Sequence, residues 1–318
     1  MSETVQPPQT GLLTIAAVEM ETGLSKDVLR VWERRYGFPC PQRGPGGDRV
    51  YSADQLVKLK LVCRLVDAGL RPGRILPMPL EALRELAGEE PLAREGGNPV
   101  QQQAMRLLTE YRSGELRREL NQAILRDGLY RFITETAAPL SAMVGEAWTR
   151  GEIRIFEEHL FTETLTIVLR GAISQLPGSG RPPRVLLTTL PAEPHALGLL
   201  MAEAALSLEG ADCVSLGTQT PVSDIAAAAI ANRSDVVALS SAGNFPPKML
   251  SEGLTALRRS LPPQVALWGG GAGMGRLRRV PEGVLRLTSL DDVGRALSEW
   301  RSQSSQWSNS NLSGGPRH

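Results

Sequence analysis

Apolar positions follow two different spacings along this chain, and the spacing changes near residue 179. Over residues 98–178 apolar side chains recur every three or four positions, which predicts four helices joined by short turns and therefore a helical bundle. Over residues 179–300 short apolar runs alternate with helical segments. That alternation is typical of a parallel, doubly wound (Rossmann-like) sheet, so we expect a multidomain chain of α and α/β classes.

Caps and helix breakers place the expected elements more closely. Asn98 and Pro99 are typical of a helix cap and first helical position, and Pro139 is expected to kink the third bundle helix or to start it afresh. The bundle helices are expected at 100–112, 116–126, 129–150 and 153–175, and the strands at 184–189, 212–217, 235–240, 264–269 and 284–287. A polar linker is expected at 88–98, and a disordered polar tail at 301–318.

Short capped helices fill the segment 11–88. Thr14 is typical of the cap of a first helix, and Ser25 of the cap of a second, with a glycine turn between them. Two such helices predict a helix-turn-helix. The Pro- and Gly-rich stretch that follows carries Arg43 and Arg49, and it predicts a basic β-ribbon, or wing.

Charge is concentrated in this first segment. The whole chain has a formal net charge of +1, but residues 11–76 contain eleven Lys or Arg and seven Asp or Glu, a balance of +4. Basic residues on a helix most often form a solvated face. On a helix-turn-helix, however, local positive charge favours binding to the DNA backbone.

Cysteine usage and hydropathy narrow the cellular setting. Cys40, Cys63 and Cys213 lie far apart and share no CxxC spacing, so they predict neither a disulfide framework nor a zinc site. We expect a reducing cytoplasm. No apolar run approaches the roughly 18–20 residues of a membrane span, and no signal peptide is visible in the polar, proline-rich start.

Histidine is scarce, and its positions are informative. Of three histidines, His159 follows Glu158 and stands eleven positions after Trp148, while His195 stands two positions after Glu193. A neutral imidazole is the commonest protein ligand of transition metals, so these settings favour a metal or a metallo-cofactor. The plainer interpretations are a tryptophan that packs a helix end and a Glu–His pair on a helix surface.

Candidate binding residues of the α/β region fall where predicted strands end. Glu193 and His195 follow the first strand, Thr220 the second, Ser240 the third and Gly269–Gly270 the fourth. Ligands bind doubly wound sheets at the carboxyl ends of the strands. Neither GxGxxG nor GxxxxGK[ST] follows the first strand, so a dinucleotide or ATP site is poorly supported.

The first segment resembles a known DNA-binding domain. The stretches LTIA at 13–16, VWERRYG at 31–37 and RVYS at 49–52 resemble the winged-helix domain of the MerR transcription regulators, over about residues 11–78. The resemblance implies dimeric binding to pseudo-palindromic promoter DNA, with the second helix in the major groove. The residues that it implicates in DNA contact are Arg30, Arg34, Arg35, Tyr36, Arg43 and Arg49.

The α/β region carries a second resemblance. His-x-x-Gly at 195–198, 41 residues, Ser-x-Ala at 240–242, 26 residues and Gly-Gly at 269–270 are similar to the base-off/His-on cobalamin-binding pattern. The resemblance implies that His195 is the lower ligand to cobalt and that Glu193 fixes its tautomer. Glu193 stands where many members have Asp, and Ala242 where many have Leu. The cofactor-binding residues expected here are Glu193, His195, Gly198, Thr220, Ser240, Gly269 and Gly270.

Together these parts resemble the MerR-type, cobalamin-binding, light-responsive regulators of the CarH/LitR family, over nearly all of residues 11–300. The resemblance implies that the bundle at 98–178 caps the upper face of the cofactor, with Trp148, Glu158 and His159 against the adenosyl group. It implies a repressor, not an enzyme, that binds adenosylcobalamin (cobalt) and promoter DNA as a homo-oligomer, either a dimer or a tetramer, and releases the DNA on illumination.

One position departs from the family. Thr149 stands where well-known members carry the histidine that captures cobalt after photolysis. The alternative is therefore a regulator that binds cobalamin or another tetrapyrrole and has an altered light response or none. An enzyme built on the same corrinoid module is disfavoured, because a DNA-binding domain accompanies the module and no catalytic barrel does.

Overall fold

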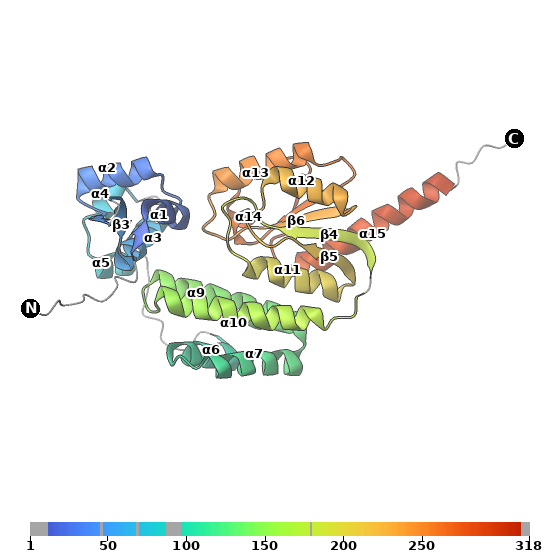
Figure 1. Ribbon diagram of the computed structural model, residues 1–318, viewed down its shortest axis with the longest axis horizontal. Helices are drawn as coiled ribbons and strands as arrows, with labels where there is room; N and C mark the ends of the chain where they lie inside the picture. The colour runs from blue at the N-terminus through green and yellow to red at the C-terminus, as the bar shows by residue number, and fades with distance from the viewer. Residues whose placement is uncertain (1–11, 45–46, 68–69, 87–96, 179, 313–318) are drawn as a thin grey trace, which may run out of the picture. The chain divides into compact units, whose positions relative to one another are not determined.

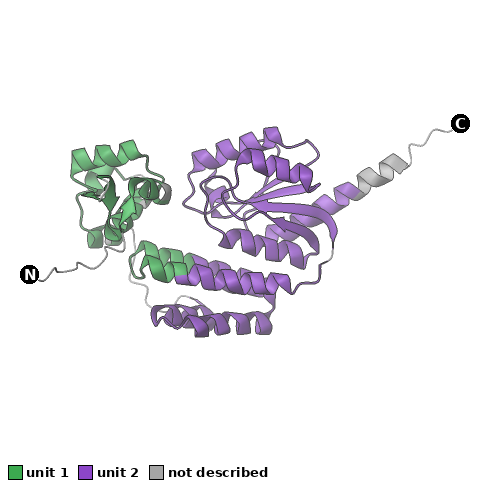
Figure 2. Cartoon of the chain, in the orientation of Figure 1, with its two compact units in different colours: residues 1–96, 142–159 green, residues 97–141, 160–318 purple. Residues whose placement is uncertain are grey.

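The chain divides into two compact units. The computed structural model describes residues 12–44, 47–67, 70–86, 97–178 and 180–312. One unit contains residues 1–96 and 142–159, and the other contains residues 97–141 and 160–318 (Figure 2). Most of the linker expected at 88–98, together with the domain boundary at residue 88, lies outside the described residues.

The first unit begins with the expected helix-turn-helix and wing. Its elements are β1 (Leu13–Thr14), α1 (Ile15–Thr22), α2 (Lys26–Tyr36), β2 (Gln42–Arg43), β3 (Arg49–Tyr51), α3 (Ala53–Asp67), α4 (Pro72–Ile75) and α5 (Leu80–Leu86). The strands form an antiparallel sheet in the order β1-β3-β2. Both predicted caps are confirmed, because the Thr14 hydroxyl accepts from the Ala17 N–H and the Ser25 hydroxyl from the Val28 N–H. Helix α5 was not expected.

The bundle helices match the expected ones except at the third. They are α6 (Pro99–Thr109), α7 (Ser113–Asp127), α8 (Leu129–Arg131), a π-helical segment η1 (Phe132–Ala137), α9 (Ala138–Thr149) and α10 (Ile155–Ser174). Helices α9 and α10 each run from one unit into the other (Figure 2). Asn98 caps α6 as predicted, in a reciprocal capping box with Gln101.

The π-helical segment η1 ends just before Pro139, the residue that was expected to break this helix. In an α-helix the carbonyl of residue 135 would accept from the N–H of residue 139, and proline has none. The Glu135 carbonyl accepts instead from the side-chain amide of Gln101 at 2.8 Å and from that of Asn98 at 3.2 Å. A buried side chain on α6 therefore satisfies the carbonyl that Pro139 leaves without its helical partner.

The second unit contains the predicted parallel sheet (Figure 1). Its strands are β4 (Arg181–Thr188), β5 (Ala211–Ser215), β6 (Val236–Ser240), β7 (Ala266–Gly270) and β8 (Val284–Arg286). The helices between and after them are α11 (Leu197–Leu208), α12 (Val222–Ala231), α13 (Pro247–Ser260), α14 (Ala272–Arg276) and α15 (Asp291–Leu312). The strand order is β5-β4-β6-β7-β8 with parallel pairing throughout, so the order reverses between β4 and β6.

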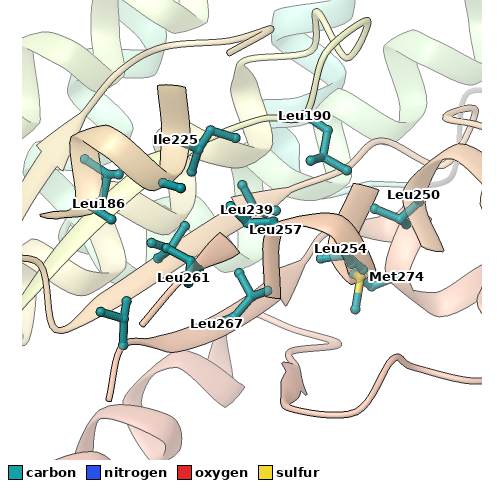
Figure 3. Packing of buried hydrophobic residues seen from close by; sticks show 14 of the residues in the cluster. Leu186, Leu190, Ile225, Leu239, Leu250, Leu254, Leu257, Leu261, Leu267 and Met274 are labelled. Carbon is teal, nitrogen blue, oxygen red and sulfur yellow. The ribbon is translucent and has the colours of Figure 1, made fainter. Parts of the chain in front are cut away.

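One face of the sheet packs on α12 and α13 through an apolar core (Figure 3). Leu186 and Leu239 come from the central strands, Ile225 from α12 and Leu254 from α13, and each is buried. Near-continuous apolar runs in β4 and β6 fit this position, because central parallel strands are covered on both faces. The core fixes the carboxyl edge of the sheet, where the candidate ligand residues lie.

The C-terminal expectation was wrong in part. A disordered tail was expected over 301–318, but α15 continues to Leu312. Arg301 ties this helix to the domain, since its guanidinium donates to the carbonyls of Pro182 and Glu209. Between Arg295 and Ser313 the sequence contains neither glycine nor proline, so nothing local ends the helix at residue 300. Residues 313–318 lie outside the described residues.

The role of Gln101 leads to a test. Gln101→Leu should destabilise α6 and η1 by about 1–2 kcal/mol, because the Glu135 carbonyl loses the nearer of its two side-chain donors and Asn98 loses its capping partner. Hydrogen exchange of the amides of α6 would measure this as faster opening. Gln102→Leu is the matched control, since the exposed Gln102 amide donates only to Gly97. Equal effects in the two variants would contradict the assignment.

Candidate cofactor site and DNA-binding surface

Glu193 is a buried carboxylate with several partners at the carboxyl edge of the sheet. It lies in the loop after β4 and is 1% exposed. One carboxylate oxygen accepts from the His195 backbone N–H at 3.1 Å and faces the His195 Nδ1 at 2.5 Å. The other accepts from the Ala242 backbone N–H, in the loop after β6, at 2.8 Å. A buried carboxylate requires such compensation, so three N–H groups hold Glu193 in place.

The Glu193 carboxylate also fixes the His195 ring. With Nδ1 donating to the carboxylate, Nε2 is the ring nitrogen that would coordinate a metal. The His195 side chain is 45% exposed, so the ring stands at the surface while its orienting partner is buried. This is the pairing that the sequence predicted. Alanine in place of the leucine found in many family members at position 242 leaves this pairing intact, because Ala242 contributes only its backbone N–H.

Two buried threonines at the end of β4 support these loops, and neither was predicted as a site residue. The Thr189 hydroxyl donates to the Glu193 carbonyl at 2.6 Å and accepts from the Gln219 N–H at 2.8 Å. The Thr188 hydroxyl lies 2.8 Å from the Thr220 hydroxyl. Their signal in the sequence was the polar pair that ends an otherwise apolar strand.

Gly198 and Ser240 lie together, as the resemblance implied. A Cβ built on Gly198 would lie 2.8 Å from the Ser240 hydroxyl, so the first turn of α11 approaches the end of β6 closely. Glycine permits that approach because it has no side chain. The structure therefore brings Glu193, His195, Gly198 and Ser240 to one region of the sheet edge, at the point where the strand order reverses.

The glycine-rich loop after β7 is hydrogen-bonded to the loop after β6. The Ser241 N–H donates to the Gly270 carbonyl at 3.1 Å, and the Gly273 N–H donates to the Ser241 carbonyl at 3.0 Å. Gly271 has a φ of +87°, and a Cβ there would clash with the Ser241 carbonyl. At Gly269 the space beside the Cα is filled by Met274, whose Cε would lie 2.7 Å from a Cβ.

These residues fit a cofactor that brings most of its own metal ligands. A corrin brings most of the ligands of its cobalt with it, so a single oriented imidazole is a donor that the protein would add. The Glu193–His195 pair provides that donor, and the close glycine approaches beside it leave no room for larger residues. Among the described residues, no cluster of three or more His, Cys, Asp and Glu is placed to hold a metal.

Helix α2 presents the basic surface of the first unit. Leu29 and Trp32 are buried on its inner face, and Arg30, Arg34 and Arg35 are exposed. Gly37 ends the helix with a φ of 69°, which directs the chain into the wing. The structure therefore exposes three of the arginines for which DNA contact was predicted.

The other predicted DNA residues are less exposed or lie in the wing, and each contacts another part of the domain. The Arg49 guanidinium pairs with Glu33 at 3.1 Å, and Arg43 donates to the Gly47 carbonyl at 2.7 Å. Tyr36 lies against α4, where a Cβ on Gly73 would be 3.2 Å from its ring. These contacts position the wing and the end of α2, and contact with DNA stays a prediction for each residue.

The predicted cap residues Trp148, Glu158 and His159 belong to the unit that contains the helix-turn-helix. Trp148 packs against that domain's apolar core, and Lys60 lies over its ring. His159 is 70% exposed, with Nε2 3.6 Å from Glu158. The Thr149 hydroxyl donates to the Gly145 carbonyl at 2.7 Å, an ordinary contact within a helix.

Three family models match successive parts of the chain. Residues 13–76 match the family model described as MerR HTH family regulatory protein. Residues 100–170 and 183–294 match two models, each described as B12 binding domain. The HTH-type transcriptional repressor CarH of Myxococcus xanthus is 30% identical over 256 residues, which are 79% of this chain and 85% of CarH.

The chain belongs to the CarH/CarA family of MerR-type transcriptional regulators. The HTH-type transcriptional repressor CarA of the same organism is 28% identical over 82% of this chain and 87% of CarA. A solved monomethylamine corrinoid protein of Methanosarcina barkeri shares the fold, with a TM-score of 0.50 and 13% identity over 61% of this chain and 94% of that one. The curated relatives that match most of the chain are transcription regulators rather than enzymes. No described helix has the length and apolar character to cross a membrane.

The loop after β7 leads to a test of the site's framework. Gly271→Ala should destabilise the α/β domain by about 2–5 kcal/mol, because it adds a strained positive φ and a clash with the Ser241 carbonyl. Calorimetry of the full chain would show a lower unfolding temperature. Gly275→Ala, on α14 and with open space around it, should change little. Similar unfolding temperatures for both variants would show that the loops are not joined in this way.

Proposed function

We propose that this chain is an adenosylcobalamin-dependent transcriptional repressor that binds promoter DNA as a homo-oligomer and releases it on illumination. The observation that carries the proposal is the buried Glu193 carboxylate holding the His195 ring at the switch point of the sheet. The match to CarH and CarA supports the regulatory role. When bound, the cofactor supplies a cobalt–carbon bond that light cleaves.

Different residues would hold the two sides of the cofactor. His195 is the lower ligand, and Glu193 keeps its proton on Nδ1 so that Nε2 can coordinate. Gly198, Thr220, Ser240, Gly269 and Gly270 flank the nucleotide side of the cofactor. Trp148, Glu158 and His159 cover its upper side. In this scheme the lower residues retain the cofactor, and the upper residues respond to the state of its axial group.

DNA binding rests on the exposed arginines of α2 and on symmetry. A single recognition helix covers one half-site, and MerR-type domains act in pairs on pseudo-palindromic sequences. A dimer or tetramer of this chain would supply the pairs. Arg30, Arg34 and Arg35 would contact bases or phosphates of the major groove, and Arg43 and Arg49 the backbone beside it.

A second candidate function is a cobalamin- or tetrapyrrole-binding regulator with a weak light response or none. It is favoured by Thr149, whose hydroxyl is bonded to the Gly145 carbonyl and is a poor cobalt ligand beside an imidazole. Residue 149 therefore cannot secure the upper face after illumination. Only His159 offers another imidazole among the proposed cap residues.

The lower ligand is tested by substitution. His195→Ala should weaken cobalamin binding and abolish the His-on absorbance spectrum. Glu193→Ala should weaken binding about 10–100-fold, because the imidazole loses its orientation. Titration of each purified protein with adenosylcobalamin in the dark would measure both effects, with His159→Ala as the control that keeps the lower site. An unchanged spectrum in His195→Ala would refute the assignment.

The DNA surface is tested by salt dependence. Arg34→Ala should weaken binding to any duplex and reduce the slope of log affinity against log salt by about one, if Arg34 contacts a phosphate. Arg117→Ala, an exposed arginine on α7, is the matched control. The joint change of Arg30, Arg34 and Arg49 to alanine should abolish measurable binding. Unaltered DNA affinity in that triple variant would remove the winged-helix interpretation.

The light response is tested by comparing residue 149 variants. Illuminated wild type should show no spectral contribution of an imidazole at position 149, and it should retain cobalamin less well than illuminated Thr149→His. His159→Ala would reveal whether His159 contributes after illumination. If light changes neither the spectrum nor the assembly of the adenosylcobalamin-loaded wild type, the second candidate function replaces the first.

A further inference from the structure

The proposed cap tryptophan has a partner in the DNA-binding domain. Within the first unit, the Lys60 ammonium on α3 lies 3.1 Å from the centre of the Trp148 ring. Lys60 is buried, with 9% exposure, and pairs with Glu21 on α1 at 2.8 Å. A desolvated ammonium over an indole face is the strongest form of the cation–π interaction. The Lys60–Trp148 contact is therefore more than chance proximity on a surface.

Neighbouring residues extend this contact. Trp148 packs against the apolar cluster that contains Leu56, Leu59 and Leu83. The Arg84 guanidinium on α5 donates to the Arg150 backbone carbonyl, two residues after Trp148. Three helices of the DNA-binding domain, α1, α3 and α5, thus contribute to one surface that receives the end of α9.

The charge of a second proposed cap residue acts on the same lysine. Burial lowers the pKa of Lys60, while the negative charges of Glu21 and Glu158 oppose that shift. Glu158 is thus close enough to act on the Lys60 charge. Of the three residues proposed to cover the cofactor's upper side, Trp148 and Glu158 both interact with Lys60 in this arrangement.

We infer that the Lys60–Trp148 contact is a docked state of the DNA-binding domain that competes with the cofactor for the cap residues. The inference rests on the proposed function, in which Trp148 and Glu158 cover the upper ligand. Trp148 cannot contact Lys60 and the apolar residues of the DNA-binding domain and at the same time cover the cofactor. Cofactor binding therefore releases the domain, and docking weakens cofactor binding to the same extent, because linkage is reciprocal.

Docking acts on the orientation of the domain rather than on its DNA surface. The contact uses α1, α3 and α5, whereas Arg30, Arg34 and Arg35 on α2 stay exposed. Two recognition helices must reach half-sites about one helical turn of DNA apart. A domain that is held on its own cap cannot adjust to that spacing, so the chain without cofactor is the weaker DNA binder.

The test uses the full chain and a matched pair of variants. Lys60→Met removes the ammonium but keeps an apolar stem. Lys58→Met removes an ammonium from the same helix, where Lys58 lies 4.4 Å from the Phe38 ring. Fluorotryptophan labelling gives a fluorine NMR signal for Trp148, assigned with Trp148→Phe. Without cofactor, this signal should move in Lys60→Met and not in Lys58→Met.

The second readout is cofactor affinity in the dark. Lys60→Met should bind adenosylcobalamin about two- to thirtyfold more tightly than wild type, the range expected from loss of one cation–π contact. Lys58→Met should bind as wild type does. If Lys60→Met fails to fold, Arg84→Gln weakens the same docking from α5 and should shift both readouts in the same direction.

The outcomes separate this inference from the proposed function. The inference is wrong if the Trp148 signal does not move in Lys60→Met, or if the cofactor affinity of that variant is unchanged or weaker. Either result would leave the proposed cofactor site unaffected. Failure of wild type to bind adenosylcobalamin overturns the proposed function, and the competition with it. A moved signal together with tighter binding in Lys60→Met alone supports the inference.

Discussion

A carboxylate buried at the edge of a sheet needs donors, and the geometry of the candidate site follows from how Glu193 obtains them. Two donors belong to His195 and one to the backbone of Ala242. The loops after β4 and β6 are neighbours only because the strand order reverses between these strands. The topology of the sheet thus orients one imidazole, and the buried threonines at the end of β4 keep the loop in place.

Much of this could be predicted where the signal is local. Thr14, Ser25 and Asn98 each cap a helix as expected, since capping depends on a few adjacent residues. The match of Glu193 with His195 was also predictable, because both lie in one short loop. The parallel sheet followed from its alternating apolar runs, but its strand order, and with it the switch point between β4 and β6, was not predicted.

The remainder depends on contacts between residues distant in sequence. The π-helical segment before Pro139 uses the Gln101 amide from another helix. Helix α15 extends to Leu312, and Arg301 on it donates to two backbone carbonyls more than ninety residues away in the sequence. The Thr188 and Thr189 hydroxyls likewise bond to residues of the loop after β5, about thirty positions away in the sequence. The Lys60–Trp148 contact joins residues of α3 and α9, which no spacing rule connects. The last of these contacts is the one that joins a proposed cap residue to the helices of the first unit.

In the proposed function His195, oriented by Glu193, would be the protein ligand to the cobalt of a bound cobalamin. Electron paramagnetic resonance of the cob(II)alamin-loaded protein tests it directly, because the axial nitrogen splits each cobalt line. The full chain would be prepared with histidine labelled with the heavy nitrogen isotope and with unlabelled cofactor. The account predicts that the triplet splitting becomes a doublet and that the doublet is lost in His195→Ala. A triplet that persists in the labelled protein would show that the cofactor's own base holds the cobalt, which would contradict the account.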